Sequence, residues 1–156
     1  MRTFKDIFAI IPARGGSKGI RNKNLKEIDG IPLIKRTINI AKESKFINRI
    51  FVSTNSQEIA TLCQKSGADI IHRPTELGLD QTSSEDVLIH AIEYLEESKK
   101  IIPKLVVFLQ CTSPFSLTKD IDGTIEKLIE DGADCAFAGA DFKHFLWNQK
   151  GDFMAG

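Results

Sequence analysis

Short apolar runs alternate along the chain with longer segments in which apolar residues recur at helical spacing. The short runs predict strands, which fall at residues 7–13, 49–54, 69–73, 105–110 and 135–140. The first and fourth runs are strongly apolar, so both strands are expected to be buried on their two faces. The longer segments predict helices, which fall at residues 32–45, 56–66, 84–98 and 119–131.

The order of these elements predicts an α/β fold of Rossmann-like type, with a mostly parallel sheet and helices on both faces. Residues 75–84 lack periodicity and predict a loop, after which Ser84 is the expected N-cap of the third helix. In such sheets ligands bind at the carboxyl ends of strands, near a switch in strand order. The loops of interest therefore follow Ala13, Thr54, Arg73 and Gln110.

The charge balance gives no sign of a nucleic-acid or acidic-membrane partner, because Lys+Arg and Asp+Glu each number 21. The chain has no run of 18 apolar residues, and no small-residue cleavage site follows the first apolar run. We therefore expect neither a membrane span nor a signal peptide. Three widely spaced cysteines, Cys63, Cys111 and Cys135, predict reduced thiols in a cytoplasmic protein, rather than disulfides or a zinc site.

Residues 14–26 form a basic loop with five Lys or Arg residues and no acid, although the chain as a whole is neutral. The loop contains three glycines, Gly15, Gly16 and Gly19. Glycine allows sharp turns, which can bring backbone N–H groups close to an anion. Arg14 and Lys18 add charges that can clamp phosphate oxygens. The spacing fits neither a Walker A loop nor a G-x-G-x-x-G loop. A solvated basic turn is the alternative, but the position directly after a buried strand favours phosphate binding.

Four segments resemble the acylneuraminate cytidylyltransferase family in order and spacing, namely IIPARGGSKGIRNKNL, STNSQEIA, HRPTELGLDQTSSEDVLIHAIE and FLQCTSPF. The resemblance extends over essentially the whole chain. It implies a nucleotidyltransferase fold and transfer of CMP from CTP to the anomeric hydroxyl of a sialic-acid-like nine-carbon ulosonic acid, with release of pyrophosphate. On this resemblance residues 1–156 are a nucleotide-binding cytidylyltransferase domain whose C-terminal part is missing.

The same resemblance implies roles for particular residues. The triphosphate is expected to be held by Arg14, Ser17, Lys18 and Lys23, of which Arg14 and Lys18 are also the candidate catalytic residues. Asn24 is expected near the cytosine, and the base and ribose are expected to contact Arg73, Ser84 and the backbone around Thr82. The sugar-acid pocket is expected to be shaped by Gln110, Thr112, Ser113 and Pro114. These roles suit phosphoryl transfer, which depends on positioning and charge neutralisation.

The resembled family uses Mg²⁺, and its aspartate ligands are expected beyond residue 156. Asp120 and Asp122 have the spacing of a metal pair, but they lie at a predicted helix start, where acids favour the helix dipole. We therefore expect them to be capping and surface charges. Cys111 is expected to be a packing residue, and His144 is a weaker candidate for a substrate contact.

Two alternatives stay open. Within the same chemistry, the substrate could be legionaminic acid, pseudaminic acid or the eight-carbon 3-deoxy-manno-octulosonate. In a different class, the chain could bind CTP without catalysing a reaction. The resemblance further implies a homodimer for the full-length protein, with CTP and a sugar acid as partners, while the charge balance and the apolar pattern predict no nucleic-acid or membrane partner.

Overall fold

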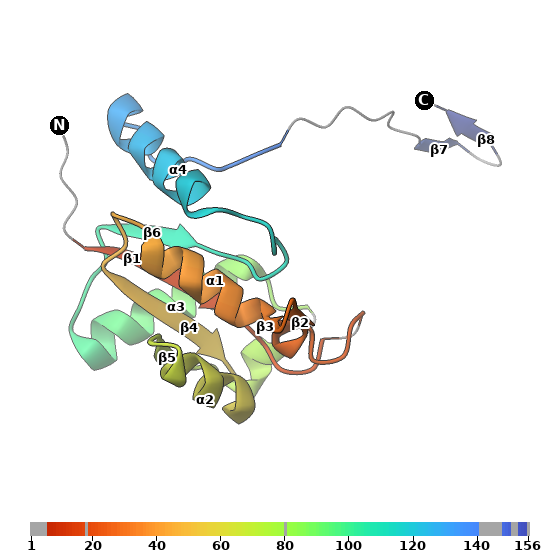
Figure 1. The fold of residues 1–156 in the computed structure, drawn as a ribbon, viewed down its shortest axis with the longest axis horizontal. Coiled ribbons are helices and arrows are strands. Elements are labelled where there is room, and N and C mark those ends of the chain that lie inside the picture. Colours follow the sequence, from red (N-terminus) through yellow and green to blue (C-terminus); the bar gives the residue numbers. More distant parts are fainter. Residues whose placement is uncertain (1–5, 18, 80, 141–147, 151–152, 156) are drawn as a thin grey trace.

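The computed structural model describes residues 6–17, 19–79, 81–140, 148–150 and 153–155. Its helices are α1 (Leu33–Glu43), α2 (Gln57–Lys65), α3 (Ser84–Lys99) and α4 (Thr118–Asp131), with short 3₁₀ helices at Lys23–Leu25 and Thr75–Gly78. Its strands are β1 (Ile7–Pro12), β2 (Glu27–Ile28), β3 (Ile31–Pro32), β4 (Arg49–Thr54), β5 (Asp69–His72), β6 (Leu105–Phe108), β7 (Asn148–Lys150) and β8 (Phe153–Ala155). Figure 1 shows their arrangement. In the part of the chain that is described, no helix has the length and apolar character needed to cross a bilayer.

The central sheet has the strand order β5-β4-β1-β6, and every pairing in it is parallel. The chain builds outward from β1 to β4 and β5, and then crosses to the opposite side of β1 to form β6. The strand order therefore reverses between β1 and β6. Such a switch point opens a crevice at the carboxyl ends of the two strands, where α/β proteins bind ligands.

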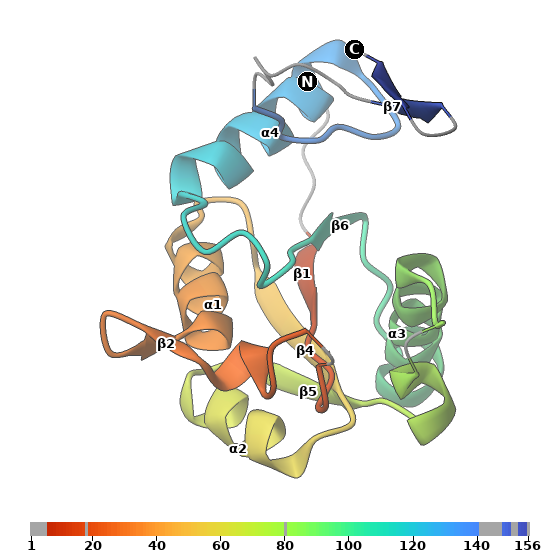
Figure 2. The same ribbon diagram turned by 90° about the vertical axis from the view of Figure 1, so that its right-hand side faces the viewer.

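Alternate residues of β1 face opposite layers of helices, which confirms the predicted α/β fold with helices on both faces (Figure 2). Ala9 and Ile11 pack against α1 and α2, whereas Phe8 and Ile10 pack against α3. This strand is buried on both faces, as its apolar sequence predicts. Burial of each such isoleucine stabilises the folded state by about 1.5–3 kcal/mol relative to leaving the side chain exposed.

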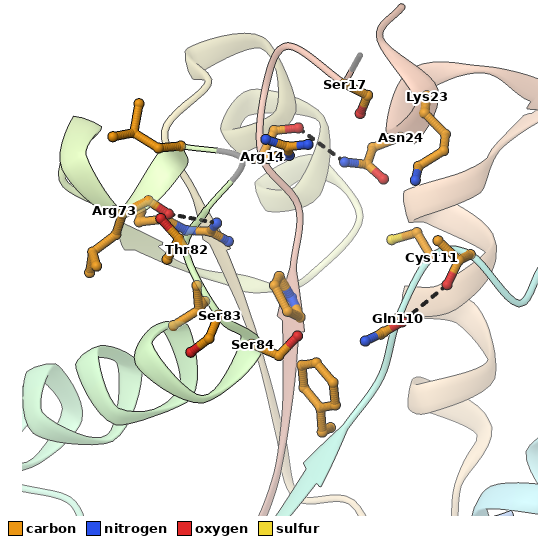
Figure 3. Close-up of a pocket in the computed structure, with 16 residues that line it drawn as sticks. Arg14, Ser17, Lys23, Asn24, Arg73, Thr82, Ser83, Ser84, Gln110 and Cys111 are labelled. Carbon is orange, nitrogen blue, oxygen red and sulfur yellow. Dashed lines mark hydrogen bonds between the residues drawn. The ribbon is translucent and has the colours of Figure 1, made fainter. Parts of the chain in front are cut away.

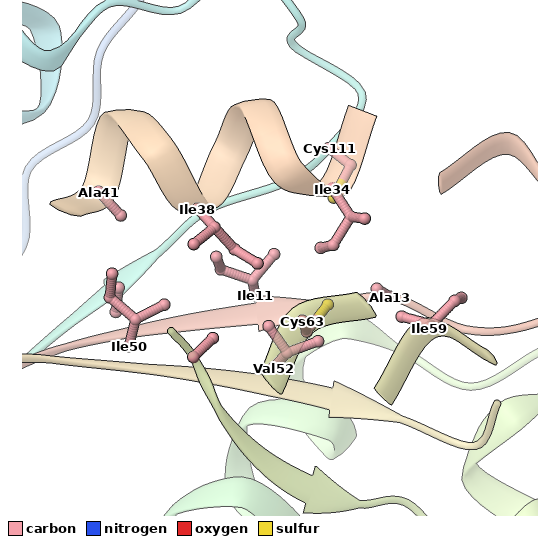
Figure 4. Close-up of a cluster of buried hydrophobic side chains, with 12 residues drawn as sticks. Ile11, Ala13, Ile34, Ile38, Ala41, Ile50, Val52, Ile59, Cys63 and Cys111 are labelled. Atoms are coloured by element: carbon pink, nitrogen blue, oxygen red, sulfur yellow. The ribbon is translucent and has the colours of Figure 1, made fainter. Parts of the chain in front are cut away.

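The layer between the sheet, α1 and α2 is shown in Figure 4. Ile34, Thr37, Ile38 and Ala41 are the buried residues of α1, and their spacing places them on one face of the helix. The three apolar ones among them pack in one cluster with Val52 of β4 and Cys63 of α2. Because this layer fixes α1 and α2 on the sheet, it also fixes where the loops after β1 and β4 emerge.

Two strand predictions differ from the structure. The strand predicted at residues 105–110 ends at Phe108 in the structure. Its residues are half-buried rather than buried on both faces, because β6 pairs with β1 alone within the described residues. The predicted strand at 135–140 is wrong, since these residues have no strand structure and Phe137 is 90% exposed. A strand needs a neighbour for its backbone hydrogen bonds, and the described part of the chain offers none there.

The start of α3 also differs from its prediction, because Ser83 rather than Ser84 is the N-cap. Ser83 Oγ accepts from the Asp86 amide at 3.0 Å, and Asp86 Oδ2 accepts from the Ser83 amide at 3.2 Å. This reciprocal pair is a capping box. The sequence contained the signal, since an acid lies three residues after Ser83, whereas Val87 lies three residues after Ser84.

Candidate functional site

A pocket of about 290 Å³ lies at the switch point, between the carboxyl ends of β1 and β6 and the start of α3 (Figure 3). Its polar lining comes from loops that follow strands and from the first turn of α3. The lining residues are Pro12, Arg14, Ser17, Lys23, Asn24, Arg73, Leu77, Leu79, Thr82, Ser83, Ser84, Val87, Phe108, Gln110, Cys111 and Thr112.

The first wall of the pocket is the basic loop after β1. Asn24 lies in the 3₁₀ helix Lys23–Leu25 and is 6% exposed. Its Nδ2 donates to the backbone oxygen of Arg14 at 3.1 Å, and this bond ties the two ends of the loop together. Arg14, Ser17 and Lys23 thereby line the same side of the pocket (Figure 3).

Arg73, directly after β5, brings a buried charge to the pocket. It is 7% exposed, and it donates from Nη2 to the Ser53 carbonyl at 2.7 Å and from Nε to the Ser53 hydroxyl at 3.2 Å. A third bond runs from Nη1 to the Leu77 carbonyl at 3.4 Å. Burial, and secondarily the nearby charge of Arg14, lowers the pKa of Arg73 from 12.5 to about 10. Both positive charges line the same pocket and favour the binding of an anion there.

The second wall of the pocket is the segment before α3. Thr82 Oγ1 donates to the Glu76 carbonyl at 3.3 Å, which ties this segment to the 3₁₀ helix Thr75–Gly78. Ser84 follows the N-cap, and its side chain is exposed at the pocket. Apolar side chains complete this region of the lining, namely Leu77, Leu79, Val87 and Phe108.

The third wall is the segment after β6. Thr112 Oγ1 donates to Gln110 Oε1 at 3.2 Å, and both side chains are exposed. Cys111 is 3% exposed and packs in the layer beneath α1. Burial raises the pKa of its thiol to about 11, so the thiol is neutral at pH 7. This agrees with a packing role for Cys111.

Nine of the residues predicted from the sequence meet in this pocket, which are Arg14, Ser17, Lys23, Asn24, Arg73, Thr82, Ser84, Gln110 and Thr112. Ser113 instead lines a neighbouring pocket of about 450 Å³ between β6 and α4, which Gln110 also lines. Pro114 lines neither of the two. Lys18 and His144 lie outside the described residues. The roles assigned to all of these residues stay predictions.

Sequence reasoning missed Ser83 and most of the apolar lining. The capping box was the available signal for Ser83. For Leu77 and Leu79 the sequence carries no comparable signal, because they lie in a segment without periodicity. An Asp29-Gly30 pair was another unused signal. Both residues have positive φ, 52° and 71°, and they form the tight turn between β2 and β3.

The described residues do not fit a Mg²⁺ site. None of the described lining residues of the pocket is Asp or Glu, and no three His, Cys, Asp or Glu side chains gather elsewhere in the described ranges. Asp120 Oδ2 accepts from the Leu117 amide at 2.9 Å, while Asp122 Oδ1 accepts from Ser44 Oγ at 2.6 Å. Asp120 thus caps the start of α4, as predicted, whereas Asp122 is half-buried and joins α4 to the end of α1 rather than capping the helix.

Several known proteins are similar to this chain in sequence. An N-acylneuraminate cytidylyltransferase A of Danio rerio is 33% identical over 95% of this chain, and its counterpart in Escherichia coli is 39% identical over 74%. A CMP-N,N'-diacetyllegionaminic acid synthase of Campylobacter jejuni is 36% identical over 70% of the chain. The chain spans 33%, 26% and 47% of these three relatives, respectively.

Solved structures share the fold at lower sequence identity. A CMP:2-keto-3-deoxy-manno-octonic acid synthetase complexed with CTP has a TM-score of 0.69 and 22% identity, covering 83% of this chain and 49% of its own. A nucleotidyl transferase from Methanothermobacter has a TM-score of 0.61 and 13% identity, covering 78% of this chain and 57% of its own. A family model described as cytidylyltransferase matches residues 8–147. The chain therefore belongs to the cytidylyltransferase family, as its sequence motifs predict.

Proposed function

We propose that the switch-point pocket binds CTP, and that the protein containing this chain transfers CMP to a sialic-acid-like nine-carbon ulosonic acid with release of pyrophosphate. The observation that carries this proposal is the convergence of Arg14, Lys23 and Arg73 on one pocket whose described lining holds no carboxylate. The match of residues 8–147 to the cytidylyltransferase family supports it.

The triphosphate is the part of CTP that suits the basic loop. Arg14 and Lys23 line one side of the pocket. Their positive charges are proposed to neutralise the negative charge that the phosphate oxygens carry during the reaction. Lys18 lies in the same loop by sequence and is proposed to act with Arg14. In phosphoryl transfer these cations hold the phosphates in place and neutralise charge, while the sugar hydroxyl attacks the α-phosphorus and pyrophosphate leaves.

The cytosine is proposed to contact Asn24 and Arg73. Asn24 Nδ2 is engaged by Arg14, whereas its Oδ1 has no donor among the described residues and can accept from the cytosine N4 amine. Arg73 has five N–H groups, and three are engaged by Ser53 and Leu77. The two others suit the O2 and N3 acceptors of cytosine. Ser84 and the backbone around Thr82 are proposed to contact the ribose.

The sugar acid is proposed to bind beside Gln110 and Thr112, at the end of β6, with Ser113 and Pro114 next along the chain. The relatives named for N-acylneuraminate favour that acid as the substrate. The legionaminic acid synthase of Campylobacter jejuni supports legionaminic acid as an alternative substrate. Two further alternatives are pseudaminic acid and 3-deoxy-manno-octulosonate, the eight-carbon acid for which the CTP-bound structural neighbour is named.

Three further properties belong to this proposal. Magnesium is proposed as the required metal, with ligands outside the described residues. A cytoplasmic location is proposed because the three cysteines are free thiols. A homodimer is proposed for the full-length protein, and the open edge of β6 within the described part of the chain is compatible with further contacts there.

The decisive experiment is a pyrophosphate-release assay on the protein encoded by the complete natural reading frame. It contains CTP or UTP, Mg²⁺ and one of four acids: N-acetylneuraminic, legionaminic, pseudaminic or 3-deoxy-manno-octulosonic acid. We expect release with CTP and a nine-carbon acid, and much less with UTP. Release with the eight-carbon acid alone would show that the proposed substrate is wrong.

A CTP-binding module without catalysis is the second candidate function. It is favoured by the absence of Asp and Glu from the described pocket lining. Carboxylates hold the metal ions that neutralise phosphate charge during phosphoryl transfer, so a pocket without them suits binding better than catalysis. The two candidates differ in one measurement. Calorimetry that shows CTP binding, together with no pyrophosphate from any of the four acids, would establish the module instead of the enzyme.

A further inference from the structure

Asn55 lies at the junction between β4 and α2, and its backbone is held on both sides. Thr54, before it, is 1% exposed, and Thr54 Oγ1 accepts from the Ser56 amide at 3.1 Å. Ser56, after it, is the N-cap of α2, and its Oγ accepts from the Ile59 amide at 3.4 Å. The side chain of Asn55 therefore projects from a rigid support next to the pocket, although the residue itself does not line it.

The side-chain oxygen of Asn55 holds the basic loop. Asn55 Oδ1 accepts from the Gly15 amide at 2.9 Å, across 40 positions of sequence. The loop passes close to the junction at this point, since a Cβ added to Gly15 would lie 3.1 Å from Ser56 Cβ. The bond therefore sets the position of the residue that follows Arg14.

The side-chain nitrogen of the same residue faces the opposite wall. A Cβ added to Gly78 would overlap Asn55 Nδ2 and would lie 3.1 Å from Asn55 Cγ. Gly78 ends the 3₁₀ helix Thr75–Gly78, in which the Leu77 carbonyl accepts from Arg73. One amide group thus lies between the loop that carries Arg14 and the helix that holds Arg73.

We propose that Asn55 is a positioning residue, which spaces the basic loop and the 3₁₀ helix Thr75–Gly78 so that Arg14 and Arg73 converge on the switch-point pocket. This inference rests on the proposed function for its ligand. The hydrogen bond to Gly15 and the contact with Gly78 are features of the chain alone. They can be tested whether or not CTP binds.

The first experiment compares Asn55→Ala and Asn55→Asp with the unaltered chain. Asn55→Ala removes the acceptor, so NMR should show the Gly15 amide exchanging with solvent at least fivefold faster, and calorimetry should show about tenfold weaker CTP binding. Asn55→Asp keeps an acceptor oxygen and should retain slow Gly15 exchange. Gln64→Ala removes an exposed amide near the C-terminal end of α2, whereas the contact lies before the N-terminal end, and it should change neither measurement.

The second experiment approaches the contact from the other side. Gly78 has no positive φ, so Gly78→Ala meets no backbone penalty, but the new Cβ displaces the movable end of the Asn55 side chain. We expect faster Gly15 exchange and weaker CTP binding from this change. In the Asn55→Ala background the overlap is absent, and Gly78→Ala should have little further effect. Gly123→Ala, which adds a Cβ to open space on α4, is the matched control.

The outcomes separate this inference from the proposed function. If the unaltered chain binds CTP and Asn55→Ala binds it equally well, the positioning role is wrong. The role is also wrong if the effects of Asn55→Ala and Gly78→Ala simply add. If the unaltered chain binds no CTP, the proposed function fails, and Gly15 exchange still shows whether Asn55 holds the loop. Thermal midpoints within a few degrees of the unaltered chain show that general unfolding does not cause the effects.

Discussion

Arg73 and Ser53 are joined by two hydrogen bonds, one from Nη2 to the backbone carbonyl at 2.7 Å and one from Nε to the hydroxyl at 3.2 Å. Ser53 is fully buried in β4, directly beside β1 in the sheet. The planar guanidinium matches this pair of acceptors, and its charge is thereby held in the interior next to the pocket. The guanidinium of Arg73 is thus anchored to a central strand of the sheet, although Arg73 itself follows β5.

Arg73→Lys tests whether the fork of donors matters beyond its charge. A lysine carries its donors on a single nitrogen and does not reproduce the three guanidinium contacts with Ser53 and Leu77, so we expect the free energy of unfolding to fall by about 1–3 kcal/mol. CTP binding, measured by calorimetry, should weaken at least tenfold. Arg49→Lys is the matched control, because Arg49 makes an exposed ion pair with Asp69, and such pairs contribute about 0–1 kcal/mol. Wild-type affinity in Arg73→Lys would remove Arg73 from the nucleotide site.

Ser83 and Ser84 are adjacent serines, and we predict that replacing the first lowers stability whereas replacing the second weakens CTP binding. Ser83→Ala removes the N-cap of α3 and should lower the free energy of unfolding by about 1 kcal/mol, measured in urea. Ser84→Ala removes a hydroxyl at the pocket and should leave stability within about 0.5 kcal/mol, while CTP binding weakens several-fold. Equal stability losses would show that the cap is shared between them.

The strands of the fold were predictable where burial dictates their sequence. The run at β1 is apolar because the strand is covered on both faces, and Arg49–Thr54 was predicted with its observed bounds. The apolar segment at 135–140 is equally suggestive in sequence but forms no strand. Apolar character records a tendency toward burial, whereas a strand also requires a hydrogen-bonding neighbour, which a local pattern does not reveal.

The candidate site was predictable where it follows strand ends. Arg14, Arg73 and Gln110 come soon after β1, β5 and β6, and parallel strands bring their carboxyl ends to one edge of the sheet. Ser113 and Pro114 are only a few residues further along, yet the turn after β6 carries them away from the pocket. Their position depends on loop conformation, which sequence spacing does not fix.

Asn24→Ala tests recognition of the base. The proposed acceptor for the cytosine N4 amine is Asn24 Oδ1, and uracil has a carbonyl oxygen in place of that amine. We expect CTP binding to weaken about tenfold, equivalent to about 1.4 kcal/mol, and UTP binding to change much less. Asn39→Ala on α1 is the control for loss of an amide away from the pocket. A parallel loss of affinity for both nucleotides would assign Asn24 to holding the loop rather than to reading the base.

Alkaline pH should destabilise the protein through its two buried thiols. Burial raises the pKa of Cys63 from 9.0 to about 12 and that of Cys111 from 9.0 to about 11. In the unfolded chain both thiols lose their protons near pH 9, so between pH 9 and about 11 the folded state binds more protons. The free energy of unfolding should therefore fall as pH rises through this window, by up to about 1.4 kcal/mol per pH unit for each thiol.

Urea unfolding at pH 8 and 10.5 measures this slope. A Cys63→Ala, Cys111→Ala double variant should have a smaller slope than a variant in which the exposed Cys135 is replaced by alanine. Equal slopes in the two variants would show that the buried thiols are not the source.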